Sequence, residues 1–177
     1  AWKSIGHPRL IVEKFVEFRR EVSIIAVRAE DGELAFYPMA ENAHHEGILR
    51  YSIAPAPKLE KHVQEDAERY IKALLNELNY VGVLTLELFE TAEGLVANEM
   101  APRVHNSGHW TTEGAVTSQF ENHIRAICGL PLGDTGLAAK KVEMHNLIGA
   151  QADDWQGLLS DGANQLHLYG KGESRPD

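Results

Sequence analysis

Two glutamates in one short stretch of the chain have the spacing to bind a divalent cation together. Glu87 and Glu99 stand on either side of a turn signal at Gly94, and an apolar run flanks each side of that turn. This pattern predicts a β-hairpin. If the turn has an odd number of residues, the carboxylates lie directly opposite each other, about 5 Å apart on one face. If the number is even, they are one step out of register.

Opposed carboxylates repel each other unless a cation lies between them, and hard oxygen ligands suit Mg²⁺. Asn98 precedes Glu99 and could complete such a site with its carboxamide. The alternative is a solvent-exposed hairpin with glutamates on its outer face, because Glu is a common residue. The loop after Pro102 favours a ligand site, since it is dense in polar side chains: Arg103, His105, Asn106, Ser107 and His109. Such a loop is costly to place unless it binds a polar ligand.

Two sequence motifs carry a resemblance to a known family. They are NEMAPRVHNSGHWT, residues 98–111, and SQFENHIRAICGLPLGDT, residues 118–135. The chain closely resembles ATP-grasp ligases of the 5-(carboxyamino)imidazole ribonucleotide synthase family, over essentially its whole length. The resemblance implies ATP and Mg²⁺ as cofactors, and carboxylation of 5-aminoimidazole ribonucleotide with bicarbonate through carboxyphosphate, in purine biosynthesis. Family members are usually homodimers, so we expect a homodimer.

The resemblance also implies roles for individual residues. Adenine would lie against the segment Glu13, Lys14, Phe15 and Val16. Glu21 would bind the ribose hydroxyls, and His44, within a pattern spanning residues 42–50, would contact ATP. Asn98 and Glu99 would bind the nucleotide, and Glu87 and Glu99 would hold the metal. The pocket in which carboxyphosphate meets the amine would be lined by Arg103, His105, Asn106 and Ser107.

Two further positions are assigned to substrate. Lys171 matches the family lysine that holds the 5′-phosphate of the ribonucleotide. Arg50 is a plausible clamp for phosphate or carboxyphosphate, because guanidinium groups bind such anions in fixed geometry. The alternatives are a strand-edge salt bridge for Arg50 and an edge charge for Glu13.

The histidine pairs do not indicate zinc. His44 and His45 are neighbours in an expected loop with no cysteine nearby. His105 and His109 are four residues apart, which would form a metal pair on a helix, but Pro102 and Gly108 favour a loop there.

Composition narrows the classes of protein. The chain has 177 residues, a net charge of −9 and no basic run, which argues against nucleic acid as a partner. It has no apolar run near the length of a membrane span and no signal peptide at its start. The single Cys128 rules out an internal disulfide and fits a reducing compartment, so we expect a cytoplasmic protein without a membrane partner.

The resemblance implies an α+β fold, the C-terminal lobe of an ATP-grasp domain, with mainly antiparallel sheet and flanking helices on one side. Hydrophobic periodicity and turn signals place its elements. The patterns predict strands over residues 9–16, 21–28 and 33–39, a helix over 59–78, the hairpin from 81, a helix opened by the capping box 118–121, and short strands over 142–148 and 165–169. We expect residues 1–133 to form part of an ATP-grasp lobe and residues 134–177 to begin a small C-terminal domain.

The family resemblance implies that this chain covers only about half of a family enzyme. The lysines and the glycine-rich loop that bind the ATP phosphates belong to the half that it does not cover. We therefore expect the fragment alone to be inactive. Two other functions remain open. One is another ATP-grasp carboxylate–amine ligase, and the other is a non-catalytic nucleotide-binding or dimerisation module.

Overall fold

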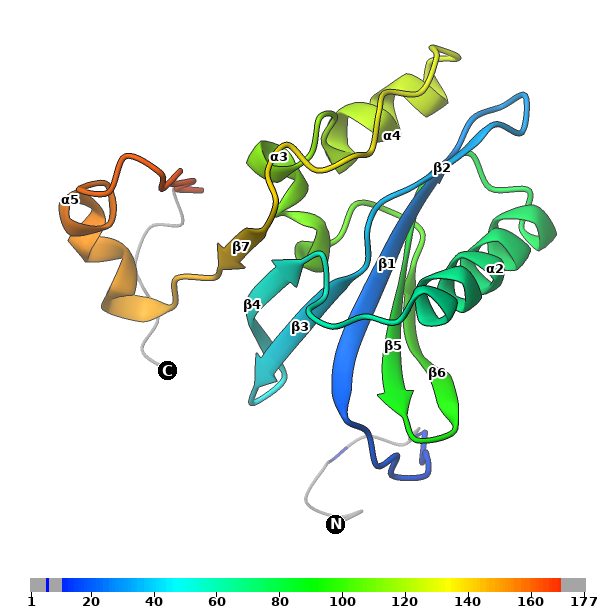
Figure 1. Ribbon diagram of the computed structural model, residues 1–177, viewed down its shortest axis with the longest axis horizontal. Coiled ribbons are helices and arrows are strands. Elements are labelled where there is room, and N and C mark those ends of the chain that lie inside the picture. The colour runs from blue at the N-terminus through cyan, green and yellow to red at the C-terminus, as the bar shows by residue number, and fades with distance from the viewer. Residues whose placement is uncertain (1–5, 7–10, 170–177) are drawn as a thin grey trace.

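A seven-stranded antiparallel sheet forms the centre of the structure, a computed structural model that describes Gly6 and residues 11–169 (Figure 1). The strand order is β6-β5-β1-β3-β4-β7. Strand β2 pairs with residues 26–28 of β1, farther along β1 than the residues 21–23 that pair with β3. The strands are β1 (Arg20–Arg28), β2 (Leu34–Phe36), β3 (Ala40–His45), β4 (Ile48–Ala54), β5 (Gly82–Thr91), β6 (Gly94–Ala101) and β7 (Val142–His145).

The helices are short except for one. They are α2 (Lys61–Glu77), α3 (Thr111–Gly114), α4 (Gln119–Ile127) and α5 (Trp155–Leu158), with 3-10 turns η1 (Asn106–Gly108) and η2 (Gly149–Asp154). In Figure 1, α2 runs along the sheet, α3 and α4 gather above it, and α5 lies to the left beyond β7. Among the described residues, no helix is both long and apolar enough to cross a membrane.

Helix α2 covers one face of the sheet because its apolar residues recur at helical spacing. Its buried side chains Ala67, Ile71 and Leu75 pack against alternate residues of the two central strands. Those strand residues are Val22, Ile24 and Ala26 on β1, and Leu84, Leu86 and Leu88 on β5. Successive side chains of a strand point to opposite faces, so the residues between them face away from α2.

A second core fills the upper part of the opposite face. Ile25, Val27 and Val83 pack there with Trp110 and Ala126, which belong to the polar loop and to α4. The expected antiparallel sheet with flanking helices is therefore confirmed, but the expectation that helices lie on one side only is wrong. Helix α4 does not bury its apolar residues as α2 does. Its buried residues are Gln119, Asn122 and Ala126, whereas its apolar Phe120, Ile124 and Ile127 are exposed.

Three expected strands differ from the structure. Residues 11–16 form no strand, and Ile11, Val12 and Phe15 are exposed. A β-branched run becomes a strand only where a neighbour takes up its backbone hydrogen bonds, and none does so among the described residues. Residues 165–169 form no strand for the same reason. The strand expected over 33–39 is confirmed only as β2.

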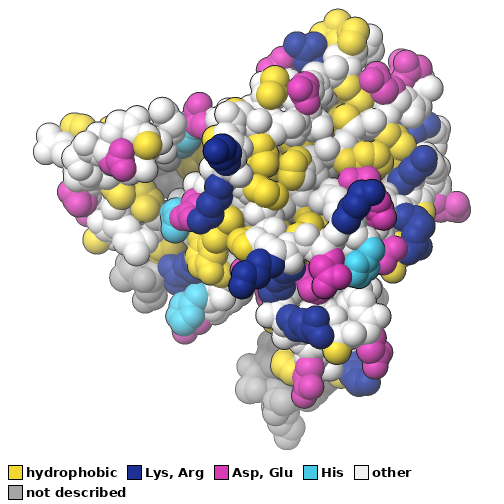
Figure 2. All heavy atoms as spheres, in the orientation of Figure 1, with side chains coloured by type: hydrophobic (Ala, Val, Ile, Leu, Met, Phe, Trp, Pro, Cys, Tyr) yellow, Lys and Arg dark blue, Asp and Glu magenta, His cyan; other side chains and the backbone are white. Residues whose placement is uncertain are grey.

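Residues 40–54 form a hairpin that the sequence patterns did not predict. His44 and His45 end β3 rather than lying in a loop. Glu46 and Gly47 form its turn, with φ of 53° and 75°, and this left-handed pair is the geometry that joins two antiparallel strands tightly. Beyond the expected domain boundary at residue 134, β7 pairs with β4. On the face shown in Figure 2, Lys and Arg side chains are interspersed with Asp and Glu.

Candidate active site

The sheet face opposite α2 carries a row of polar side chains below the second core. Strand pairing sets Ser23 opposite Glu87 and sets Glu21 opposite Asn42. Directly paired residues point to the same face, so these side chains share a surface. The buried amide of Asn42 donates to Ser23 Oγ at 2.9 Å and accepts from Ser52 Oγ at 2.7 Å. These hydrogen bonds tie β1, β3 and β4 together beneath the row.

The two glutamates of the predicted hairpin lie directly opposite each other. The turn between Thr91 and Gly94 has two residues, an even number that alone would leave the carboxylates one step out of register. A β-bulge corrects the register, because Leu88 pairs with Ala97 and Glu87 pairs with Glu99. Asn98 is the extra residue of this bulge, a device that often re-aims side chains next to active sites.

Glu87 and Glu99 differ in exposure. Glu99 is exposed, whereas Glu87 is buried, and among the described residues its Oε1 has no hydrogen-bond partner. Burial raises the pKa of Glu87, and the charges of Glu99 and Glu21 raise it further, although His44 and Ser107 lower it. A bound cation would relieve both the desolvation and the repulsion, so the pair fits Mg²⁺. The described residues contain no group of three or more His, Cys, Asp or Glu suited to a metal.

The polar loop lies over this pair. Nδ1 of His105 is 3.5 Å from Glu87 Oε1 and 2.9 Å from Ser107 Oγ. The backbone N–H of Ser107 donates to the same Nδ1 at 3.3 Å. Burial lowers the pKa of His105, with a further contribution from Arg103. The ring is therefore neutral near pH 7, and because Nδ1 accepts, its proton is on Nε2.

The other predicted residues of the loop are more open to solvent. Arg103 is exposed and donates from Nη1 to the carbonyl of Val104 at 3.0 Å. Asn106 is also exposed, at the start of η1, whereas Ser107 is fully buried. The loop thus presents one cationic and one amide side chain to solvent.

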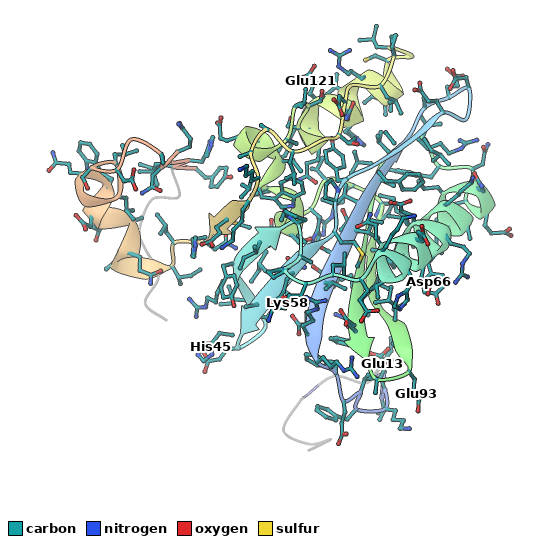
Figure 3. All side chains as sticks on the ribbon, in the orientation of Figure 1. Glu13, His45, Lys58, Asp66, Glu93 and Glu121 are labelled. Carbon is teal, nitrogen blue, oxygen red and sulfur yellow. The ribbon has the colours of Figure 1, made fainter. Side chains whose placement is uncertain are left out.

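The predicted nucleotide residues fall into two groups. Glu21 and His44 are hydrogen-bonded through Oε2 and Nδ1, across β1 and β3. Residues 13–16 lie in an extended segment outside the sheet, and Glu13 appears near the lower end of the β5–β6 hairpin (Figure 3). Phe18 fixes the segment by stacking on Phe89 with ring centroids 4.5 Å apart. Phe89 is paired with Glu21, so the segment reaches the face that carries the row.

The structure describes only one of the two predicted substrate residues. Arg50 is half-buried on β4, on the strand that also carries Ser52, and its carbonyl accepts from Asn146 N at 2.8 Å. Lys171 lies outside the described residues.

Sequence reasoning missed the buried amide that supports the loop. Gln119 is fully buried and hydrogen-bonds both backbone groups of His105, at 3.0 Å and 2.7 Å. The signal that could have found it is the helix start, since Ser118 Oγ caps α4 by accepting from Glu121 N at 3.1 Å. The cap marks Gln119 as the first residue of α4, next to the loop that it supports. The side chain of Glu121 pairs with Arg125 instead of completing the capping box.

Comparisons with known proteins agree with the motifs. A family model described as "ATP-grasp domain" matches residues 1–120. The chain is 50% identical over 171 residues to N5-carboxyaminoimidazole ribonucleotide synthase of Pseudomonas aeruginosa, covering 97% of this chain and 46% of that protein. For the Escherichia coli protein of the same name, identity is 47% over 167 residues, with 94% and 45% covered. The chain thus spans about half the length of these relatives.

Solved structures show the same likeness. The N5-carboxyaminoimidazole ribonucleotide synthetase of Thermus thermophilus superposes with a TM-score of 0.85 at 53% identity, covering 92% of this chain and 44% of that one. The Aspergillus clavatus synthase, in complex with ADP and 5-aminoimidazole ribonucleotide, gives 0.85 at 30% identity, with 92% and 45% covered. The resemblance read from the motifs is confirmed: the chain belongs to the ATP-grasp family, and these relatives are N5-carboxyaminoimidazole ribonucleotide synthases.

Proposed function

We propose that the protein carrying this chain catalyses ATP-dependent carboxylation of 5-aminoimidazole ribonucleotide with bicarbonate, in purine biosynthesis. The observation that supports this most is the position of His105, 3.5 Å from a buried carboxylate that is itself opposed to a second carboxylate. The carboxylates that would hold the metal and the ATP phosphates would thereby lie next to the loop that would bind the amine substrate. Relatives at 47% and 50% identity carry the synthase name, and one solved relative holds ADP with the ribonucleotide.

The nucleotide would bind along the row of polar side chains. Residues 13–16 would contact adenine, Glu21 would accept hydrogen bonds from the ribose hydroxyls, and His44 would contact ATP while paired with Glu21. Asn98 would add its carboxamide beside the phosphates. Glu87 and Glu99 would hold Mg²⁺, which when bound offsets the negative charge that develops on the transferring phosphoryl group.

The reaction has two steps. A bicarbonate oxygen attacks the γ-phosphorus of ATP, giving carboxyphosphate and ADP. Carboxyphosphate then releases phosphate, and its carboxyl passes as CO₂ to the exocyclic amine of the ribonucleotide, which loses a proton. The Nε2–H of neutral His105 would donate to an oxygen of the carboxyl or phosphate group, so we assign His105 the role of hydrogen-bond donor. Arg103, Asn106 and Ser107 would line the same pocket and exclude water from the labile intermediate.

The ribonucleotide site would include two cationic side chains outside the His105 loop. Lys171 would bind the 5′-phosphate of the ribonucleotide, as the family resemblance implies, and Arg50 would bind phosphate or carboxyphosphate through its guanidinium group. Residues 134–177 would begin a second, small domain. We further infer a homodimer in the cytoplasm, which is consistent with the free Cys128 but rests on the family resemblance.

The test is ¹³C NMR of the full-length protein with ATP, Mg²⁺, ¹³C-bicarbonate and 5-aminoimidazole ribonucleotide. A carbamate carbon signal that requires both ATP and the ribonucleotide is expected. Transfer to a different amine, found by screening amine acceptors, would favour another carboxylate–amine ligase. Saturable ATP binding without any turnover would favour a nucleotide-binding module.

The isolated 177-residue chain provides a separate comparison. It spans only about half of its relatives, so we expect it to bind nucleotide weakly and to release no phosphate under the same conditions. Turnover by the purified chain would contradict this part of the proposal.

A further inference from the structure

A single buried side chain holds both backbone groups of His105. Oε1 of Gln119 accepts from His105 N at 3.0 Å, and Nε2 of Gln119 donates to His105 O at 2.7 Å. We call this arrangement the amide clamp. It supplies a loop residue with the pair of hydrogen bonds that a neighbouring strand would otherwise give. Because Gln119 is fully buried, water cannot easily replace either bond.

The amide clamp is itself fixed by the rest of the loop. Gln119 N donates to Thr111 Oγ1 at 3.0 Å, and the Thr111 hydroxyl donates to Gly108 O at 2.7 Å. Gly108 makes the close approach possible, since a Cβ there would lie 2.5 Å from Gln119 Oε1 and 2.4 Å from Ile25 Cδ1. The start of α4 and the turn η1 are therefore joined through one amide.

The consequence of the clamp is the position of the imidazole ring. With its backbone held on both sides, His105 places Nδ1 2.9 Å from Ser107 Oγ and 3.5 Å from Glu87 Oε1. The ring is also bonded by Ser107 N, which belongs to the same loop, so its place beside Glu87 depends on where the loop backbone lies. Loss of the clamp would leave His105 N unpaired and His105 O with only the Gly108 N–H, at 3.0 Å, and would allow the loop to move.

We propose that Gln119 is a positioning residue, which holds His105 in place for the carboxylation of 5-aminoimidazole ribonucleotide. The proposal rests on the function proposed above. Gln119 contacts no substrate in this scheme and acts only by holding the histidine over the carboxylate pair. A misplacement of about 1 Å at such a group costs about 100-fold in rate.

Helix α4 offers a matched control. Asn122 is also fully buried, and its amide likewise holds both backbone groups of one loop residue, accepting from Gly133 N at 2.7 Å and donating to Gly133 O at 3.2 Å. Gly133 lies in the segment after α4, away from the His105 loop in sequence. The glutamine and the asparagine therefore each hold one loop residue, and Asn122 also donates to Tyr37 Oη at 2.8 Å, but only the glutamine holds a residue of the proposed pocket.

The first experiment compares Gln119→Met with Asn122→Leu in the full-length protein. Both substitutions should lower the melting temperature. Only Gln119→Met should lower kcat for ribonucleotide-dependent phosphate release, by about 100-fold, with KM for ATP changed less than about twofold. If kcat falls equally in both variants, or in neither, Gln119 has a structural role only and the proposal is overturned.

A double variant tests whether Gln119 acts through His105. If it does, Gln119→Met combined with His105→Ala should be no slower than His105→Ala alone. If the rate losses of the two single variants multiply in the double variant, the proposal is overturned. If Gln119→Met does not fold, Gln119→Glu replaces it in the same cycle, because a carboxylate keeps the acceptor for His105 N and loses the donor to His105 O.

A spectroscopic readout separates this proposal from the proposed function, because it needs no turnover. In full-length protein with ¹⁵N-labelled histidine, the His105 ring signals are identified by their loss in His105→Ala. They should shift in Gln119→Met and stay in place in Asn122→Leu. Unchanged ring signals in Gln119→Met would overturn the clamp, even if the protein proved to carboxylate the ribonucleotide.

Discussion

Glu87 and Glu99 face each other across β5 and β6 although the turn between their strands has an even number of residues. The bulge at Asn98 produces this alignment, and with it a buried carboxylate whose Oε1 has no hydrogen-bond partner among the described residues. Burial of an uncompensated carboxylate is unfavourable for stability. If Glu87 and Glu99 hold a cation as proposed, the free protein has lower stability because it keeps this carboxylate buried.

The first prediction concerns Glu87 and pH. The folded state raises the pKa of Glu87, so it binds the proton more tightly than the unfolded state does. Its contribution to stability is thus present at low pH and is lost as pH rises through the unfolded and then the folded pKa. Glu87→Gln should raise the melting temperature of the metal-free protein at pH 8, and the gain should shrink toward pH 4.

The same substitution should reduce Mg²⁺-dependent phosphate release by roughly 100-fold, because it would remove an oxygen ligand of the proposed metal site. Glu93→Gln is the control, since Glu93 is an exposed residue of the turn. A Glu87→Gln protein that is less stable than the wild type at pH 8 would show that the carboxylate is stabilising rather than costly.

The second prediction concerns the hydrogen bond between His44 and Glu21. His44→Ala should raise KM for ATP by about 10-fold, as expected for loss of a hydrogen bond to a charged group. His45→Ala should leave KM unchanged, because His45 is the exposed neighbour at the end of β3. Steady-state kinetics at saturating bicarbonate measures both. Equal effects of the two substitutions would remove His44 from the nucleotide site.

The third prediction concerns the stacking of Phe18 on Phe89, which fixes the segment assigned to adenine. Phe18→Ala should raise KM for ATP by about 2- to 13-fold, since an aromatic pair of this kind contributes about 0.5–1.5 kcal/mol. Phe18→Tyr keeps the ring and should bind ATP as the wild type does. An unchanged KM in Phe18→Ala would mean that residues 13–16 reach the nucleotide without this anchor.

The fourth prediction concerns stability away from the site. The amide of Asn122 donates to Tyr37 Oη at 2.8 Å and also holds Gly133, and burial raises the pKa of Tyr37. Asn122→Leu should lower the free energy of unfolding by about 2–3 kcal/mol, because it leaves buried polar groups unpaired. Asn164→Ala, at an exposed position, should change it by less than about 0.5 kcal/mol. Denaturant titrations measure both variants, and equal losses would contradict this account.

The sequence predicted the elements whose signals are local. The stripe of α2 and the alternation around Gly94 predicted the long helix and the β5–β6 hairpin, both of which are confirmed. The motif over residues 98–111 predicted the family, and the comparisons confirm it. The roles of the individual site residues remain predictions.

Features that depend on pairing between distant segments could not be predicted. The bulge at Asn98 depends on how β6 pairs with β5, and hydrophobic pattern alone does not fix that register. The β3–β4 hairpin was missed because polar residues such as His44 and His45 interrupt its apolar pattern. Gln119 gave no signal of its own, since a buried glutamine and an exposed one look alike in a sequence.

Phosphate release by the full-length protein tests the central claim most directly. It should be measured with ATP, Mg²⁺ and bicarbonate, with and without 5-aminoimidazole ribonucleotide, for the wild type, Glu99→Gln and the control Glu93→Gln. We predict release that the ribonucleotide stimulates, that Glu99→Gln abolishes and that Glu93→Gln preserves. Release that ignores the ribonucleotide, or that persists in Glu99→Gln, would contradict the assignment of substrate or metal site respectively.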